Sequence, residues 1–214
     1  MLKSQDLLVA LKLTSLALQS KAKADERIPV STWRGWEEQS EEADRQEIDA
    51  SRFFADNGQL RWTYADLSQR LRLSASECNA AVKRGLTSGL LSVSLKSSQP
   101  RPAPKQLLEF IVHGVKYVFP AKEGRLARGV PTAFGAPVLK GRMLTAGEHE
   151  YVWEDAQGLS TGLSIEPLHK SVPFAVRADP VLYELLALTD AIRFGKAREN
   201  TLATESLSKR MLSI

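Results

Sequence analysis

Side chains that can recognise a nucleic acid gather between residues 64 and 105. Asn79 can pair with adenine through two hydrogen bonds, and Lys83 can donate to the acceptors of guanine. Basic and hydroxyl side chains near them can hold phosphate oxygens, which position a protein on a duplex without reading its sequence. The predicted DNA-binding residues are Tyr64, Ser74, Ser76, Asn79, Lys83, Arg84, Thr87, Lys96, Arg101 and Lys105.

Most of these side chains belong to residues 62–91, whose pattern predicts two short helices, a tight turn and the start of a strand. Apolar and small residues recur at helical spacing over 64–71, and Leu73 fills the turn. Ser74 or Ser76 can cap the second helix, because a serine oxygen accepts from an otherwise unpaired N–H group.

The second helix, over about residues 76–88, has an apolar stripe and an opposite polar face. The stripe consists of Cys78, Ala81, Val82 and Leu86. The residues that must face away from it are Ser76, Ala80, Lys83 and Thr87. Two helices that share a core, one of them with a polar and basic face, follow the helix-turn-helix plan for reading a DNA major groove.

The segment resembles the winged helix-turn-helix of bacterial transcriptional regulators, the MarR-like group in particular. The matching order is Tyr64-Ala65-x-Leu67-Ser68, Leu71-x-Leu73-Ser74-x-Ser76, Ala81-Val82-Lys83-Arg84 and Gly89-Leu90-Leu91. This resemblance covers about thirty residues of the 214. It implies a regulator that binds double-stranded DNA. Lys96, Arg101 and Lys105 lie beyond the matched residues and are the phosphate candidates of the basic segment that follows.

Three residues depart from the pattern of that group. Arg72 stands where a turn glycine is common, so the left-handed geometry there is expected to be strained or different. Gly85 stands where a leucine usually packs, and a glycine inside a helix costs about 1 kcal/mol relative to alanine. Cys78 replaces the usual valine or isoleucine and is predicted to be a small core residue.

Positive charge is concentrated in the middle of the chain. Residues 58–145 contain 14 Lys and Arg and 4 Asp and Glu, a net charge of +10, whereas the formal net charge of the whole chain is +4. The segments on either side each carry a net charge of −3. A basic block that coincides with the two-helix motif is the pattern expected for phosphate neutralisation.

The segments after the motif give weaker signals. Three prolines in 96–105 favour a basic, proline-rich wing in which a second strand is poor. Residues 106–119 are predicted to be a helix that ends before Pro120. Residues 120–145 are rich in Gly and Pro and are predicted to form an extended basic loop, and 150–168 to form a hairpin.

Leucine-rich helices are predicted near both ends of the chain, over 4–19 and 180–212. Their wide apolar arcs favour a homodimer joined through them, or packing on one another within one chain. We predict a winged helix-turn-helix domain over 1–105, with an N-terminal helix and an acidic insert, and a mixed α/β domain with terminal helices over 106–214. The expected fold class is mainly α with small β elements.

No catalytic machinery is evident. The stretch 124–129, GRLARG, lacks the Lys-Ser/Thr of a phosphate-binding loop, and the three histidines are isolated in sequence. We therefore expect no enzyme, cofactor or metal. No eighteen-residue apolar run predicts a membrane span. A single cysteine suits a cytoplasmic location.

The sequence favours a sequence-specific transcriptional regulator, dimeric and bound to duplex DNA. The alternative is a protein-interaction module, such as an antitoxin or an accessory subunit, in which the winged helix binds another protein. A third hypothesis is a sensor whose aromatic residues line a ligand pocket. Its residues are Tyr117, Phe119, Phe134, Tyr151 and Trp153.

Overall fold

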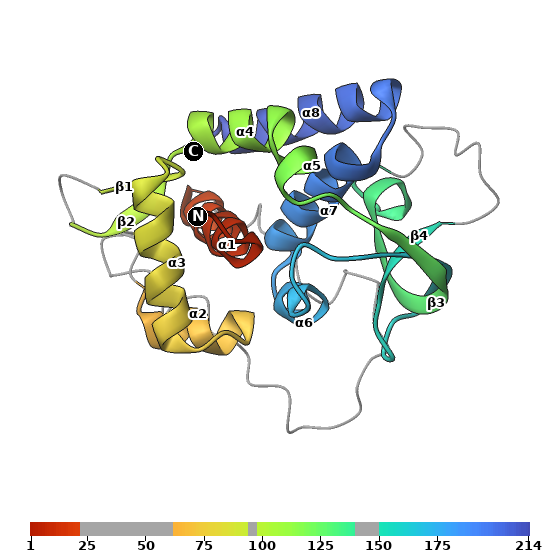
Figure 1. Cartoon of the computed structure of the whole chain (residues 1–214), viewed down its shortest axis with the longest axis horizontal. Coiled ribbons are helices and arrows are strands. Elements are labelled where there is room, and N and C mark those ends of the chain that lie inside the picture. Colours follow the sequence, from red (N-terminus) through yellow and green to blue (C-terminus); the bar gives the residue numbers. More distant parts are fainter. Residues whose placement is uncertain (22–61, 94–97, 140–149) are drawn as a thin grey trace.

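The computed structural model describes residues 1–21, 62–93, 98–139 and 150–214. These ranges are mainly helical and contain two small sheets, which confirms the predicted class of mainly α with small β elements. One helix, α1 (Ser4–Lys21), runs through the middle of the molecule. A helical pair with a hairpin lies on one side of it, and the other helices with a three-stranded sheet lie on the other side (Figure 1).

Helix α1 is buried along most of its length. Every residue from 6 to 16 is buried, because the helix packs against α3 (Ala75–Thr87), β2 (Pro100–Pro102) and α7 (Pro180–Phe194). Packing within one chain therefore accounts for the wide apolar arc of α1. The hydrophobic core also continues from the first half of the chain into the second, across the predicted boundary near residue 105.

Helices α2 (Tyr64–Leu71) and α3 pack against each other, which confirms the predicted pair of helices. Thr63 and Asp66 form a capping box at the start of α2. The Ser74 hydroxyl accepts from the backbone N–H of Glu77 at 3.1 Å, so Ser74 is the cap of α3 and Ser76 is not.

The turn between α2 and α3 has left-handed geometry at Arg72, with φ 47° and ψ 43°. A non-glycine residue in this region costs roughly 1–2 kcal/mol. The guanidinium carbon of Arg72 lies 3.7 Å above the centre of the Phe174 ring, on α6 (Val172–Val176). This cation–π contact offsets part of the strain and attaches the turn to the second half of the chain.

Gly85 and Cys78 both belong to the buried side of α3. A Cβ atom at Gly85 would lie 2.8 Å from Cδ1 of Leu91, so the glycine leaves room for the strand that follows the helix. Cys78 is fully buried, which confirms it as a core residue. Burial raises the pKa of its thiol to about 11, so the reactive thiolate is disfavoured.

A short antiparallel hairpin follows α3. It consists of β1 (Leu91–Val93) and β2, with Ser92 opposite Arg101. The second strand was expected to be poor, and β2 forms with only three residues. The hairpin continues into α4 through a hydrogen bond of 3.0 Å from the Ala103 N–H to the Leu90 carbonyl.

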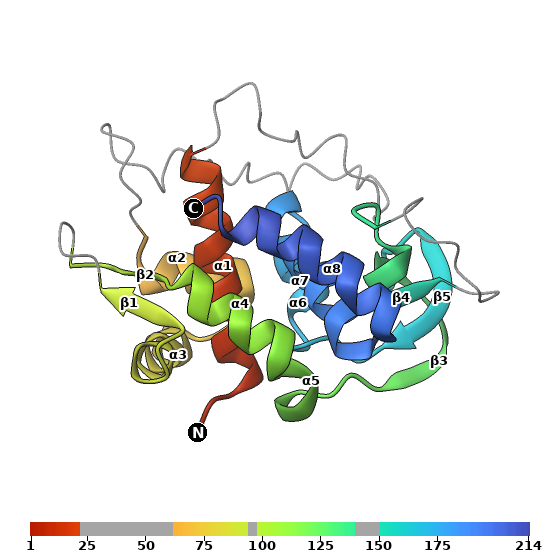
Figure 2. The same cartoon turned by 90° about the horizontal axis from the view of Figure 1, so that it is seen from above.

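The predicted helix over 106–119 is present in two pieces, α4 (Pro104–His113) and α5 (Val115–Val118), which meet at Gly114. Helix α4 lies along α8 (Ala197–Met211), at the C-terminal end of the chain (Figure 2). Helices α7 and α8 confirm the predicted helical tail, and Asp179 caps α7 by accepting from the Leu182 N–H at 2.9 Å.

The predicted loop over 120–145 was wrong for its first half, which forms the ten-residue strand β3 (Glu123–Thr132), followed by the short 3-10 helix η4 (Ala133–Gly135). Residues 140–145 lie outside the described residues. Strands β4 (Tyr151–Glu154) and β5 (Ser160–Ile165) both run antiparallel to β3. They are therefore parallel to each other and close the sheet, so the predicted hairpin over 150–168 was also wrong.

Two glycines permit this topology. The connection from β4 to β5 crosses β3, and a Cβ atom at Gly158 would lie 2.2 Å from the backbone of Gly129. A Cβ atom at Gly129 would lie 1.9 Å from the carbonyl oxygen of Trp153. Because the obstructing atoms are backbone atoms, no side-chain rotation can relieve either contact.

Replacing Gly158 by Ala should therefore lower the free energy of unfolding by about 1–3 kcal/mol, the usual cost of an overpacked site. Urea unfolding followed by tryptophan fluorescence measures this cost. Ala156→Ser, at an exposed position in the same connection, is the control and should change the free energy by no more than about 0.5 kcal/mol. Equal urea midpoints for Gly158→Ala and the control would contradict the close approach of the β4–β5 connection to β3 at Gly129.

Two buried charge networks connect α7 to elements that are distant from it in the sequence. In the first, Lys12 and Ser15 of α1 bind the Asp179 carboxylate at the start of α7, with Ser15 Oγ 2.7 Å from Oδ1. In the second, the Asp190 carboxylate of α7 accepts from the Trp153 indole N–H at 2.6 Å and pairs with Arg193. The first network therefore joins α1 to α7, and the second attaches the three-stranded sheet to α7.

Candidate nucleic-acid interface

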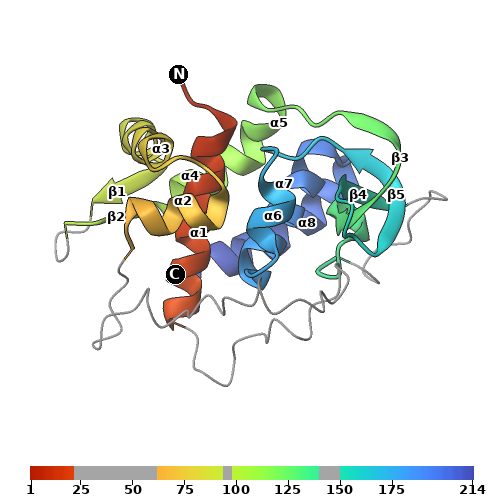
Figure 3. The same cartoon turned by 90° about the horizontal axis from the view of Figure 1, so that it is seen from below.

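The outward face of α3 carries the most coherent group of predicted contacts. Ser76, Lys83 and Thr87 are exposed and lie along one side of the helix, as the periodicity predicted. The Thr87 hydroxyl donates to the Lys83 carbonyl at 3.0 Å. Helix α3 lies at one edge of the molecule, and the three-stranded sheet lies at the opposite edge (Figure 3).

Within α3 itself, no unpaired carboxylate competes with a nucleic acid on this face. Glu77 is the only acidic residue of α3, and its carboxylate accepts from the guanidinium of Arg84 at 2.6 Å. Hydrogen bonding from Arg84 lowers the pKa of Glu77. The negative charge is therefore matched by a positive one on the same helix.

Arg84, which was predicted to contact DNA, binds a carboxylate of the same chain. Its Nε donates to Oδ2 of Asp6 at 2.8 Å, and its Nη2 donates to Oδ1 at 2.7 Å. The side chain is 24% exposed, whereas that of Asp6 is fully buried. Hydrogen bonds to Asp6 hold the pKa of Arg84 above its usual value. Arg84 therefore joins α3 to α1, and its contact with DNA stays a prediction.

Asn79 presents its amide differently from the prediction. The residue is half-buried, and its Oδ1 atom is buried with no hydrogen-bond partner among the described residues. Pairing with adenine uses both the oxygen and the nitrogen of the amide. Asn79 must therefore rotate its side chain before it can make that pair.

The remaining predicted contacts lie on other elements. Arg101 is exposed on β2 of the hairpin, and Lys105 is exposed in the first turn of α4. Tyr64 is half-buried at the start of α2, with its ring edge-on to Trp62 at a centroid distance of 5.5 Å. The Ser74 hydroxyl is used by the helix cap. Lys96 lies outside the described residues.

Sequence reasoning missed the role of Asp6. The signal that could have revealed it is a carboxylate directly before the apolar residues 7–11, where an unpaired charge would be costly to bury. Nothing in the sequence pairs Asp6 with Arg84, because the two residues meet only when α1 packs on α3.

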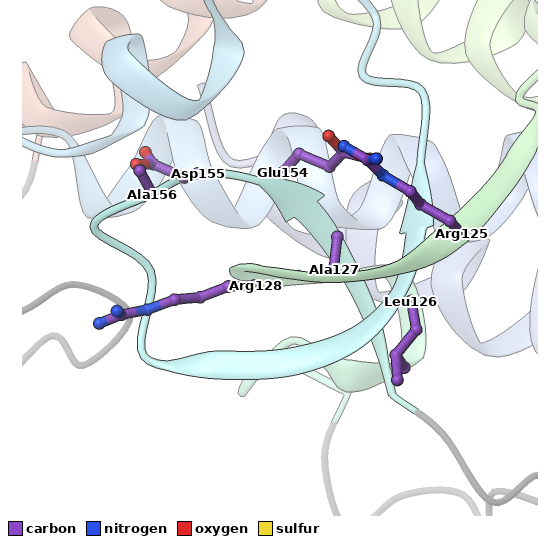
Figure 4. A pocket seen from close by; sticks show the side chains of 7 residues that line it. All are labelled: Arg125, Leu126, Ala127, Arg128, Glu154, Asp155 and Ala156. Atoms are coloured by element: carbon purple, nitrogen blue, oxygen red, sulfur yellow. The ribbon is translucent and has the colours of Figure 1, made fainter.

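An open crevice of about 480 Å³ lies on the sheet, far from α3. Figure 4 shows Arg125 and Glu154 pointing toward each other across it, and their charged groups are 3.6 Å apart. Asp155, also in its lining, pairs with Arg177 at 2.8 Å. Because these charges are matched locally, the crevice is a weaker candidate for an anionic ligand than α3 is.

The aromatic residues of the ligand-sensor hypothesis do not line a common pocket. Phe134 packs edge-on against Tyr151, which packs against Phe194 at a centroid distance of 4.8 Å. Trp153 is buried and bonded to Asp190. Tyr117 is 74% exposed. These residues mostly fill the core between α7 and the sheet.

In the ranges that the structure describes, no group of His, Cys, Asp and Glu side chains is arranged to hold a metal ion. Nor does any helix of those ranges have the length and apolar character needed to cross a membrane. Comparison of the chain with known protein families, with curated proteins and with solved structures found no match.

Proposed function

We propose that this chain is a sequence-specific DNA-binding transcriptional regulator that reads the major groove with α3 as part of a winged helix-turn-helix. One observation carries the proposal. The outward face of α3 exposes Ser76, Lys83 and Thr87, and the only carboxylate of the helix is paired with Arg84. A hairpin with the exposed Arg101 follows the helix directly.

The geometry suits a duplex. The major groove is about 12 Å wide and accepts a helix, and base edges there offer acceptors to a lysine and both donors and acceptors to hydroxyl side chains. A basic hairpin beside the helix is placed to contact the sugar–phosphate backbone, which fixes position without selecting sequence. Lys83 is thus assigned to reading the bases, and Arg101 to holding the protein on the sugar–phosphate backbone.

A homodimer remains our expectation, because one helix covers only a few base pairs and two half-sites multiply specificity. The interface is expected away from α1 and α7. The buried residues of those helices already pack within one chain, which leaves little apolar surface on them for a partner.

Replacing Lys83 by Ala should cost about 1–3 kcal/mol on a preferred DNA site and relax the choice of base. Replacing Arg101 by Ala should instead weaken binding to all sequences about equally, because a phosphate contact carries no sequence information. A preferred site is first selected from random duplexes with the wild-type chain. Fluorescence anisotropy on that site and on mixed-sequence DNA then measures both effects.

The two variants form a matched pair, since each removes one exposed cation from a neighbouring element. If they lower affinity for both DNAs by the same factor, the assignment of α3 as the reading helix is wrong.

A further inference from the structure

The side of α3 next to the proposed reading face, about 100° around the helix from it, is fixed by charged contacts with α1. Arg84 donates two hydrogen bonds to the Asp6 carboxylate, at 2.8 and 2.7 Å, and one to Glu77 at 2.6 Å. Gln5 donates to the same Glu77 oxygen, and the Lys3 ammonium lies 3.9 Å from it. The first turn of α1 thus contacts α3 at two positions.

These contacts fix more than the distance between the helices. Residues 77 and 84 are seven apart, so they lie two helical turns from each other on the same side of α3. Contacts at both positions resist sliding of α3 along its axis and rotation about it. Rotation matters most, because neighbouring residues differ by about 100° around a helix and only some of them can face a groove.

Asp6 is itself held in place. Its Oδ2 atom accepts from the backbone N–H of Lys3 at 2.8 Å, which closes the first turn of α1, and its side chain is fully buried. The planar guanidinium of Arg84 matches the carboxylate through two parallel bonds, which a lysine cannot reproduce. The pair therefore has one preferred geometry.

We propose that Arg84 is a positioning residue that sets the orientation of α3 through Asp6, and that this orientation determines how well the reading face discriminates between DNA sequences. The inference rests on the proposed DNA binding. A side chain that reads bases must be held to within about 0.5 Å by its supporting contacts. Loss of the Asp6–Arg84 geometry should therefore relax sequence choice while leaving the phosphate contacts of Arg101 and Lys105 in place.

The test compares Arg84→Lys and Asp6→Asn with the wild-type chain on a selected duplex and on mixed-sequence DNA. Arg84→Lys keeps the charge and removes the two-pronged contact, and Asp6→Asn keeps the shape and removes the charge. For each variant, the ratio of the affinity for the selected duplex to that for mixed-sequence DNA should fall about tenfold. This loss is comparable with the loss of one base contact. The dependence of affinity on salt for Arg84→Lys should not change, because it has the same number of cations.

Arg210→Lys is the matched control, since Arg210 pairs with Glu184 at 2.8 Å between α8 and α7, away from α3. It should leave the affinity ratio unchanged. Thermal midpoints from circular dichroism show that each variant is folded at the assay temperature. If one of the two variants is too unstable to assay, the other still measures the effect of the Asp6–Arg84 contact on the affinity ratio.

Two outcomes would overturn the inference while leaving the proposed function intact. In the first, Arg84→Lys and Asp6→Asn keep the wild-type ratio and lower only the thermal midpoint, as Arg210→Lys does. In the second, Arg84→Ala weakens all sequences equally and lowers the salt dependence by about one unit, as a phosphate contact would. Failure of the wild-type chain to select any duplex would overturn the proposed function and this inference together.

Discussion

Affinity for duplex DNA should fall about 10³-fold between 50 and 200 mM salt if six phosphate contacts form, because each contact releases condensed counterions from the duplex. Arg101 and Lys105 are exposed phosphate candidates in each chain, and the exposed Lys83 in the groove also neutralises phosphate charge near it. Two copies can therefore place six cations on one duplex. One copy with three contacts should lose only about 40-fold over the same range. The salt dependence therefore also tests the expected dimer.

Fluorescence anisotropy with mixed-sequence duplex DNA measures this dependence, with light scattering to determine the number of chains per complex. Arg125→Ala is the control. Arg125 is a highly exposed cation on β3, at the edge of the molecule opposite α3, so its removal should leave the salt slope unchanged. Absence of binding at 50 mM salt would contradict DNA binding. It would favour the alternative in which α2, α3 and the hairpin contact another protein, as in an antitoxin or an accessory subunit.

The second large effect concerns stability. Asp190→Ala should lower the free energy of unfolding by about 3–5 kcal/mol, because it leaves a buried guanidinium without its carboxylate. Arg193 is 9% exposed and pairs with Asp190, and the same carboxylate accepts from Trp153 at 2.6 Å. Arg193 also donates from Nε to the Phe119 carbonyl at 2.8 Å, so its position is fixed from a second side.

Urea unfolding of Asp190→Ala can be followed by tryptophan fluorescence and by circular dichroism. Glu154→Ala is the control, since Glu154 makes an exposed ion pair with Arg125, and it should change the free energy by less than about 1 kcal/mol. Asp190→Asn keeps an acceptor for Trp153, so comparison with Asp190→Ala separates the lost hydrogen bond from the lost charge. A cost below about 1 kcal/mol for Asp190→Ala would show that Arg193 finds another partner or reaches water.

Local sequence signals determined most of the helices. The starts of α2 and α3 follow from an apolar period and from the caps directly before them, Thr63 and Ser74. Helix α7 begins where Asp179 and Pro180 predict it. These signals act within one helical turn, so they can be read without knowledge of the rest of the chain. The same holds for the outward face of α3, whose exposed residues follow from periodicity.

The three-stranded sheet was decided by tertiary structure. Its longest strand, β3, includes Gly124, Gly129 and Pro131, which lower the strand propensity of the segment. The strand forms because it is paired on both edges, and the crossing at Gly129 requires a glycine at position 158. Pairing between segments that are far apart in the sequence cannot be read from a local pattern. For this reason the residues of β3 were predicted to be a loop.

The sequence by itself determined that a basic block coincides with two short helices and that α3 has a polar face with Lys83 at its centre. Only the tertiary structure decided that Arg84, next in sequence, turns inward to Asp6, and that the apolar surface of α1 is covered within one chain. The physical reason is the same in both cases. Helical periodicity fixes the direction of each side chain around its own axis, whereas its partner depends on which other helix packs there.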